Sequence, residues 1–176
     1  LTEKAEGHPF FSEEIACVLR DTGLLVIEGD EAQLAPQAGD LFALGLPSTL
    51  EGIIGSRIDR LTQGQQLTLK AASVIGRAFT HFLLRAVHPI AGERALLPRQ
   101  LETLTQLDLT LLDPGVGDAD AYLFKHVVTQ ETAYNLLLFA QRRQLHQVIA
   151  EWYERNCAGD LTPYRGWTAL PWVRAV

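Results

Sequence analysis

The stretch from residue 65 to residue 124 constrains the fold more than any other part of this sequence. Helical patterns of apolar residues cover about 65–75, 80–87 and 98–107, and two short strand-like runs follow at 109–112 and 122–124. Between the two runs lies DPGVGDAD, whose glycines, proline and aspartates are typical of a turn. The sequence therefore predicts three helices followed by a hairpin, which is the element order of a winged helix.

The residues before this stretch predict a helix, a hairpin and a second helix. The first helix runs from about Pro9 to Thr22 and stops at Gly23, and the hairpin turns at Gly29-Asp30. Ser48 and Glu51 form an S-x-x-E capping box, so the second helix covers about 49–61. Apolar residues at helical spacing predict the buried faces of the two helices: Phe11, Ile15, Val18 and Leu19 in the first, and Leu50, Ile53, Ile54, Ile58 and Leu61 in the second.

From His126 to about residue 156 the sequence is helical again, with a break expected near Phe139. We therefore expect a mainly α fold in three parts. A helical subdomain with a short hairpin covers 1–63, a winged-helix-like subdomain covers 64–125, and C-terminal helices occupy 126–176.

Composition excludes several classes of protein. Fifteen basic against 21 acidic residues leave a net charge of −6, which disfavours a chain whose main work is to bind nucleic-acid phosphates. The two cysteines match no metal or redox spacing, so we expect reduced thiols in a cytoplasmic protein. No apolar run is long enough to cross a bilayer. Because the chain starts at Leu1 and contains no methionine, we expect a piece of a larger reading frame.

The sequence lacks the motifs of a self-sufficient enzyme. It contains no phosphate-binding G-x-x-x-x-G-K-[ST] loop, no G-x-S-x-G, no H-E-x-x-H and no dinucleotide fingerprint. His81 and His88 have no acidic partner nearby and are interpreted as exposed helix-end histidines rather than metal ligands. We interpret Arg142 and Arg143 as a solvated helix face, and His146 as a residue at the edge of a buried face.

Two places carry candidate binding chemistry. Gly7-His8-Pro9 opens the first helix, and Pro9 suits a first helical position because its φ is already helical. His126 stands at the start of a helix directly after the second predicted strand. A helix start presents free N–H groups that favour anions, and an imidazole there can add a donor to a phosphate oxygen. From the residues alone, a capping or half-buried structural histidine is the interpretation that we favour for His126.

Several ordered blocks within about residues 4–156 resemble a known family: GHPFFSEEI, LPSTLEGIIGSRIDRL, AASVIGRAF and YLFKHVVTQETAYNLLLFAQRRQLHQVIAEWYE. They look like the region after the ATPase core in STAND-type signalling ATPases of the AAA kind. The most similar branch is the bacterial one that is often fused to a class III adenylate or guanylate cyclase. The resemblance implies a helical lid, a winged helix and the start of tetratricopeptide-like (TPR) repeats.

The resemblance also implies site residues. The Gly-x-Pro of the family's first lid helix matches Gly7 and Pro9, and that proline lies near the base of ATP or ADP. The winged-helix histidine that contacts the β-phosphate of ADP matches His126. Glu13 and Glu14 would repel phosphates from the first turn. The chain departs from the pattern at His8, where the family often has asparagine, and at Val127, where the motif usually continues with aspartate.

These observations predict a regulatory fragment that closes over an adenine nucleotide held, with Mg²⁺, by an upstream ATPase domain of the parent protein. The fragment alone would not be an enzyme, and its partners would be that ATPase domain, a cyclase or other effector, and proteins bound through downstream repeats. A DNA-binding winged helix is the alternative, but the wing is acidic at Asp113, Asp118 and Asp120, which makes nucleic acid an unfavourable partner. A protein-interaction scaffold built on the helices after His126 is a third reading.

Overall fold

The computed structural model describes residues 9–28, 31–35, 49–113 and 120–156 of the 176-residue chain. The fold is mainly helical, as the sequence predicts, with small antiparallel sheets. Residues group into two compact units, Leu1–Arg60 and Leu61–Val176. Each unit is described below by itself, and the three-part division made from the sequence stays a prediction.

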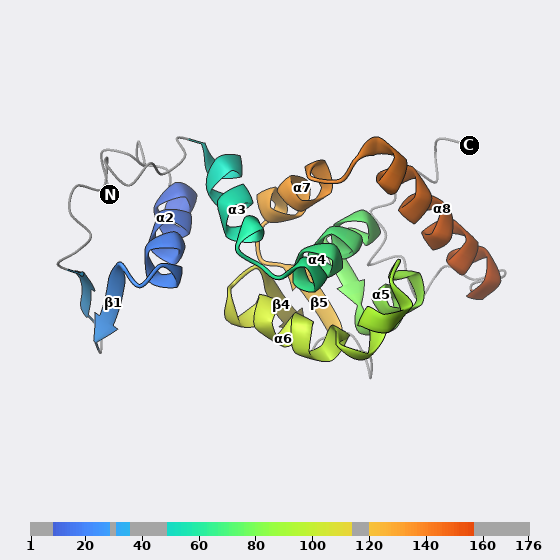
Figure 1. Ribbon diagram of the computed structural model, residues 1–176, viewed down its shortest axis with the longest axis horizontal. Coiled ribbons are helices and arrows are strands. Elements are labelled where there is room, and N and C mark those ends of the chain that lie inside the picture. Colours follow the sequence, from blue (N-terminus) through green and yellow to red (C-terminus); the bar gives the residue numbers. More distant parts are fainter. Residues whose placement is uncertain (1–8, 29–30, 36–48, 114–119, 157–176) are drawn as a thin grey trace. The chain divides into compact units, whose positions relative to one another are not determined.

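The first unit consists of two helices and a hairpin (Figure 1). Helix α2 covers Pro9–Asp21, strands β1 (Leu25–Glu28) and β2 (Glu31–Leu34) pair antiparallel, and helix α3 covers Leu50–Asp59. The hairpin is therefore confirmed, although its Gly29-Asp30 turn lies outside the described residues. Most of the predicted apolar faces are also confirmed, since the helices bury Ile15, Val18, Leu19, Ile53, Ile54 and Ile58.

Local signals set the ends of these helices. Gly23 has a φ of +71° and its N–H donates to the Arg20 carbonyl, so glycine ends α2 as predicted. The start of α3 differs from the prediction. Thr49, not Ser48, is the N-cap, and its hydroxyl accepts from the Gly52 N–H at 3.1 Å. Thr49 can cap the helix because its own backbone is extended, whereas Leu50 is already helical. Its side chain therefore satisfies a free N–H group of the first turn.

The second unit opens with a three-helix, three-strand arrangement. Its helices are α4 (Gln63–Ile75), α5 (His81–Val87) and α6 (Leu97–Gln106), with a 3-10 turn at Ala91–Ala95 before α6. Its strands are β3 (Ala78–Thr80), β4 (Thr110–Asp113) and β5 (Ala121–Phe124), in the order β3-β5-β4, all antiparallel. This is the topology of a winged helix, with β4 and β5 as the hairpin.

Strand β3 is absent from the sequence-based prediction, which began a helix at Thr80. Thr80 is instead the N-cap of α5, and its hydroxyl accepts from the Leu83 N–H at 3.1 Å. The three residues of β3 carry too short a pattern to reveal a strand. These residues form a strand because they pair with β5. Phe79 lies opposite Tyr122 in this pairing and is fully buried.

Two C-terminal helices complete the second unit. Helix α7 covers Val127–Asn135 and α8 covers Phe139–Asn156, which confirms the predicted break near Phe139. Both pack against α4, and α8 also packs against α5 (Figure 1). Within the described ranges, no helix is long and apolar enough to cross a membrane.

Arg142 is not part of a solvated face, contrary to the prediction. Its guanidinium donates to the carbonyls of Leu137 and Asn135 at 3.0 Å and lies 4.5 Å from the centre of the Tyr134 ring. These contacts satisfy carbonyls at the end of α7, which have no partner within the helix. The long arginine side chain therefore fixes the turn between α7 and α8, whereas Arg143 is exposed.

Candidate functional site

The residues assigned from the sequence to a nucleotide site are Gly7, Pro9 and His126. Gly7 lies outside the described residues. Pro9 is the first residue of α2 in the first unit, and His126 precedes α7 in the second unit. Pro9 and His126 therefore lie in different units, and the surroundings of each are given within its own unit.

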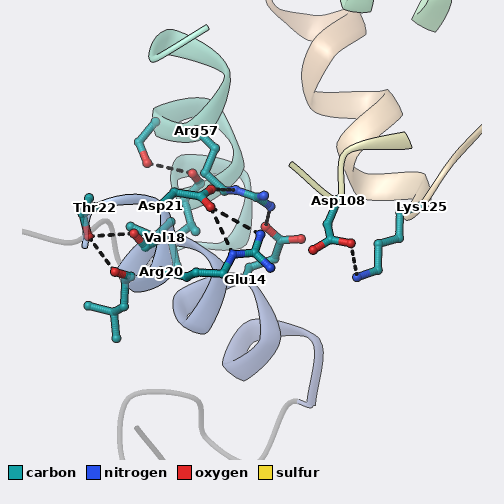
Figure 2. A network of polar contacts seen from close by, with 11 residues as sticks. Glu14, Val18, Arg20, Asp21, Thr22, Arg57, Asp108 and Lys125 are labelled. Carbon is teal, nitrogen blue, oxygen red and sulfur yellow. Dashed lines mark hydrogen bonds and ion pairs between the residues drawn. The ribbon is translucent and has the colours of Figure 1, made fainter. Parts of the chain in front are cut away.

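Helix α2, which begins at Pro9, is held to α3 by a buried ion pair (Figure 2). Arg57 of α3 donates from Nη1 to Glu14 Oε2 of α2 at 2.6 Å, and both side chains are only 2% exposed. Arg57 Nε also donates to Asp21 Oδ2 at 3.3 Å. Since a carboxylate and a guanidinium compensate each other's burial, this contact fixes the pairing of the helix that Pro9 begins.

Glu14 therefore does not act as predicted. The sequence suggested carboxylates at the mouth of the first helix that would repel phosphates. Glu14 instead points into the unit, where Arg57 neutralises it. The sequence contains a pattern from which this ion pair could have been predicted, because each helix carries a charged residue on its apolar face. Glu14 precedes Ile15, and Arg57 lies between Ile54 and Ile58.

Asp21, the last residue of α2, lies at the negative end of the helix dipole, an unfavourable place for a carboxylate. Two cations offset this cost. Besides Arg57, the neighbouring Arg20 lies 3.3 Å from Asp21 Oδ1. The end of α2 is therefore tied electrostatically to α3 (Figure 2).

The candidate residue of the second unit lies at the start of α7. His126 is the N-cap residue, with extended backbone angles of φ −131° and ψ 143°, and its carbonyl accepts from the Thr129 N–H at 3.1 Å. Its imidazole makes no side-chain capping bond to the helix. The adjacent Lys125 N–H donates to the Leu109 carbonyl at 3.2 Å, so the sheet fixes the backbone next to His126.

The electrostatics at this helix start favour an anion. The first turn of α7 contains no acidic residue, so nothing in that turn offsets the positive end of the helix dipole. Lys125 stands next to His126, and its ammonium lies 3.5 Å from Asp108 Oδ1 (Figure 2). The imidazole of His126 is half-buried at this position.

Helix α7 is anchored to α4 through polar as well as apolar contacts. Gln130 Nε2 donates to the Ser73 carbonyl at 3.0 Å. The hydroxyls of Thr129 and Thr132 are buried and have no hydrogen-bond partner within the described part of the chain. Because buried hydroxyls without a partner are costly, this helix face contributes less stability than an apolar face of the same size would.

His88 is the main correction among the histidines. It was interpreted as exposed, yet it is completely buried at the end of α5. Its Nε2 lies 3.3 Å from Thr68 Oγ1, and its Nδ1 lies 3.0 Å from the Ile90 carbonyl. Thr68 donates to Gln100 Oε1, and Gln100 in turn donates to Glu93 Oε2, each at 2.5 Å. Burial lowers the pKa of His88, despite the opposing effects of the Ile90 carbonyl and of Glu93.

Two further histidines of the described residues, His81 and His146, are partly buried. His81 is the first residue of α5. His146 lies 3.1 Å from the Tyr134 hydroxyl, which joins α8 to α7, and burial lowers its pKa. Among the described residues, no group of histidine, cysteine or acidic side chains has the arrangement of a metal site.

Comparison with known proteins leaves the family open. No protein-family profile matches the chain, and no solved structure matches it. The chain is 33% identical over 147 residues to the uncharacterized protein R02095 of Rhizobium meliloti (strain 1021). The matched region is 83% of this chain but 13% of the relative, so the chain spans about an eighth of that protein's length.

Proposed function

We propose that the chain is a regulatory segment of an ATP-dependent signalling protein. The segment closes over an adenine nucleotide that is bound mainly by an ATPase domain elsewhere in the same protein. The observation that carries this proposal is the position of His126 at the N-cap of α7, directly after the hairpin of a winged helix, at a helix whose first turn contains no acidic residue. The similarity to a small part of a much longer protein supports a role within a larger chain.

In this proposal, two parts of the chain contact the nucleotide. Pro9, at the start of α2, would border the base, and His126 together with the first amides of α7 would bind a phosphate. Mg²⁺ and the attacking water would belong to the ATPase domain. The chain's own residues would therefore bind the nucleotide without hydrolysing it.

Regulation would follow from a difference in binding between two states. A closed state, in which His126 donates to the β-phosphate of ADP, would hold the protein inactive. Exchange of ADP for ATP would open this state and release the protein from inhibition. A hydrogen bond to a charged group contributes about 1.5–3 kcal/mol, which is enough to change the ratio of the closed to the open state about tenfold or more. The effector would be a class III adenylate or guanylate cyclase or another signalling domain in the cytoplasm.

The test uses the full-length protein and its His126→Ala variant. We expect the variant to release fluorescent ADP about tenfold faster and to raise the basal output of the effector, with the ATPase core intact. His81→Ala is the matched control, since it also removes a partly buried imidazole at the start of a helix in the same unit. An unchanged ADP off-rate together with a lowered melting temperature would show that His126 is structural, and the proposal would be lost.

A further inference from the structure

A cavity of about 380 Å³ lies in the second unit, away from the start of α7. Its walls come from α4, from the end of α5 with the loop that follows, and from α8, which runs beside α4 and α5 (Figure 1). Most of the side chains that line it are apolar: Leu67, Val87, Ile90, Leu137, Leu145 and Val148. Its size falls within the range of small-molecule sites in proteins, about 300–1,000 Å³.

One permanent charge faces this apolar space. Arg94 lines the cavity, and no aspartate or glutamate does. Its Nη2 donates to the His88 carbonyl at 3.1 Å, which holds the guanidinium in place. Its Nε is buried and has no hydrogen-bond partner within the described ranges, where Arg94 also forms no ion pair. A buried N–H of a cation without an acceptor is unfavourable, so an acceptor that also carries negative charge would stabilise the site.

The neighbouring charges do not supply that anion. The Glu93 carboxylate accepts from Gln100 Nε2 at 2.5 Å and belongs to the hydrogen-bond chain that runs through Gln100 and Thr68 to His88. His88 is held between Thr68 and the Ile90 carbonyl, and burial lowers its pKa, so its ring adds no charge near neutral pH. Arg94 is therefore the group that would set the charge of a ligand.

The geometry points to a binding site for an apolar carboxylate, with the acid group on Arg94 and the hydrocarbon part along the faces of α4 and α8. An apolar cavity of about 150 Å³ accommodates benzene, so this volume suits an acid of roughly ten carbons. The amides of Gln141 and Gln144 also line the cavity and can donate to the second carboxylate oxygen. This inference goes beyond the proposed regulatory role and does not depend on it, since no nucleotide is involved.

The experiment is titration calorimetry on the 176-residue protein with decanoate, 1-decanol and decylamine, which share a chain length and differ in charge. We expect decanoate to bind about tenfold or more tightly than 1-decanol, and decylamine to bind least, because a charge-assisted hydrogen bond to a buried donor is worth at least that ratio. Arg94→Gln should remove the preference for decanoate over 1-decanol, and Arg94→Lys should keep part of it. Equal binding of decanoate and 1-decanol, or no binding of any probe, would overturn the proposal.

A second variant keeps the test decisive if loss of Arg94 disturbs the fold. Gln144 is exposed on α8 and lines the cavity, so Gln144→Glu adds a carboxylate beside the ligand without removing a core contact. Gln144→Glu should weaken the binding of decanoate several-fold and leave the binding of 1-decanol unchanged. Gln106→Glu is the matched control, because Gln106 is exposed on α6, does not line the cavity and produces the same change in net charge. Equal affinities for decanoate in the two variants would also refute the site.

Discussion

Arg57 Nη1 and Glu14 Oε2 lie 2.6 Å apart although 43 residues separate them in the chain, and both side chains are 2% exposed. This relationship makes α2 and α3 one unit in electrostatic as well as apolar terms (Figure 2). A buried charge is tolerated only with its partner, so the two residues should depend strongly on each other.

Removing one member of this pair should be much more costly than removing both. Arg57→Leu leaves Glu14 buried without its cation and should lower the free energy of unfolding by about 3–5 kcal/mol. Glu14→Leu/Arg57→Leu replaces both charges by apolar groups and should recover most of that loss. Urea melts of the single and double variants measure this, with the exposed Arg60→Leu as the control. A loss within about 0.5 kcal/mol for Arg57→Leu, typical of a surface substitution, would show that the charge is not buried.

Ile53 should behave as a core residue of the first unit. It is fully buried in a cluster with Ile15, Val18 and Leu19. Ile53→Ala should lower the free energy of unfolding by about 2–5 kcal/mol, because it removes apolar contacts and leaves a cavity. Leu138→Ala is the comparison, since Leu138 is 70% exposed and its loss should cost little. Similar losses in both variants would mean that the buried face of α3 is assigned wrongly.

At the start of α4, the side chains of Glu93 and Gln100 lie close to the backbone of Gly64. A Cβ there would lie 2.5 Å from Glu93 Oε2 and 2.7 Å from Gln100 Nε2, so Gly64→Ala must displace the hydrogen bond between these side chains. Alanine gains about 1 kcal/mol of helix propensity, but a hydrogen bond to a carboxylate is worth about 1.5–3 kcal/mol. We therefore expect net destabilisation in thermal melts.

The control for Gly64 is Gly55 in α3, where an added Cβ meets nothing within 4 Å. Gly55→Ala should therefore stabilise the protein by up to about 1 kcal/mol. In a Glu93→Ala background, where the displaced bond no longer exists, Gly64→Ala should become neutral or stabilising. Destabilisation of the same size in both backgrounds would mean that the clash lies elsewhere.

Stability should fall as the pH drops below the ordinary histidine value. Burial lowers the pKa of His88 and of His146 from 6.5, so below that pH the unfolded chain binds protons that the folded chain does not. This contribution is fully present above pH 6.5 and is lost as the pH falls through 6.5 toward the lower folded pKa values. Melting temperatures at about pH 7.5 and about pH 5.5 measure it.

The histidine variants separate this effect from other acid-sensitive groups. His88→Gln should reduce the drop in melting temperature between the two pH values, and His88→Gln/His146→Gln should reduce it further. For each variant, the quantity compared is the change in melting temperature between the two pH values. The absolute melting temperature is not used, because each variant also loses hydrogen bonds at every pH. A drop that is as large in the double variant as in the original protein would contradict the assignment.

The sequence by itself determined the order and extent of nearly all the helices and of two hairpins. Apolar spacing predicts α4, and the pattern around Phe139 predicts the break between α7 and α8, because these signals are contained within one turn or one helix face. The capping box of α4 was equally local but was not recognised: Thr62 accepts from the Gln65 N–H, and the Gln65 side chain accepts from the Thr62 N–H.

Tertiary structure decided where the polar side chains go. Periodicity cannot reveal that Glu14 meets Arg57, or that His88 is buried against Thr68, because each contact joins segments that the chain brings together only on folding. Strand β3 likewise exists because β5 supplies its hydrogen bonds. The same reason applies to Arg94, because only the packing of α8 near the end of α5 places it beside an apolar cavity.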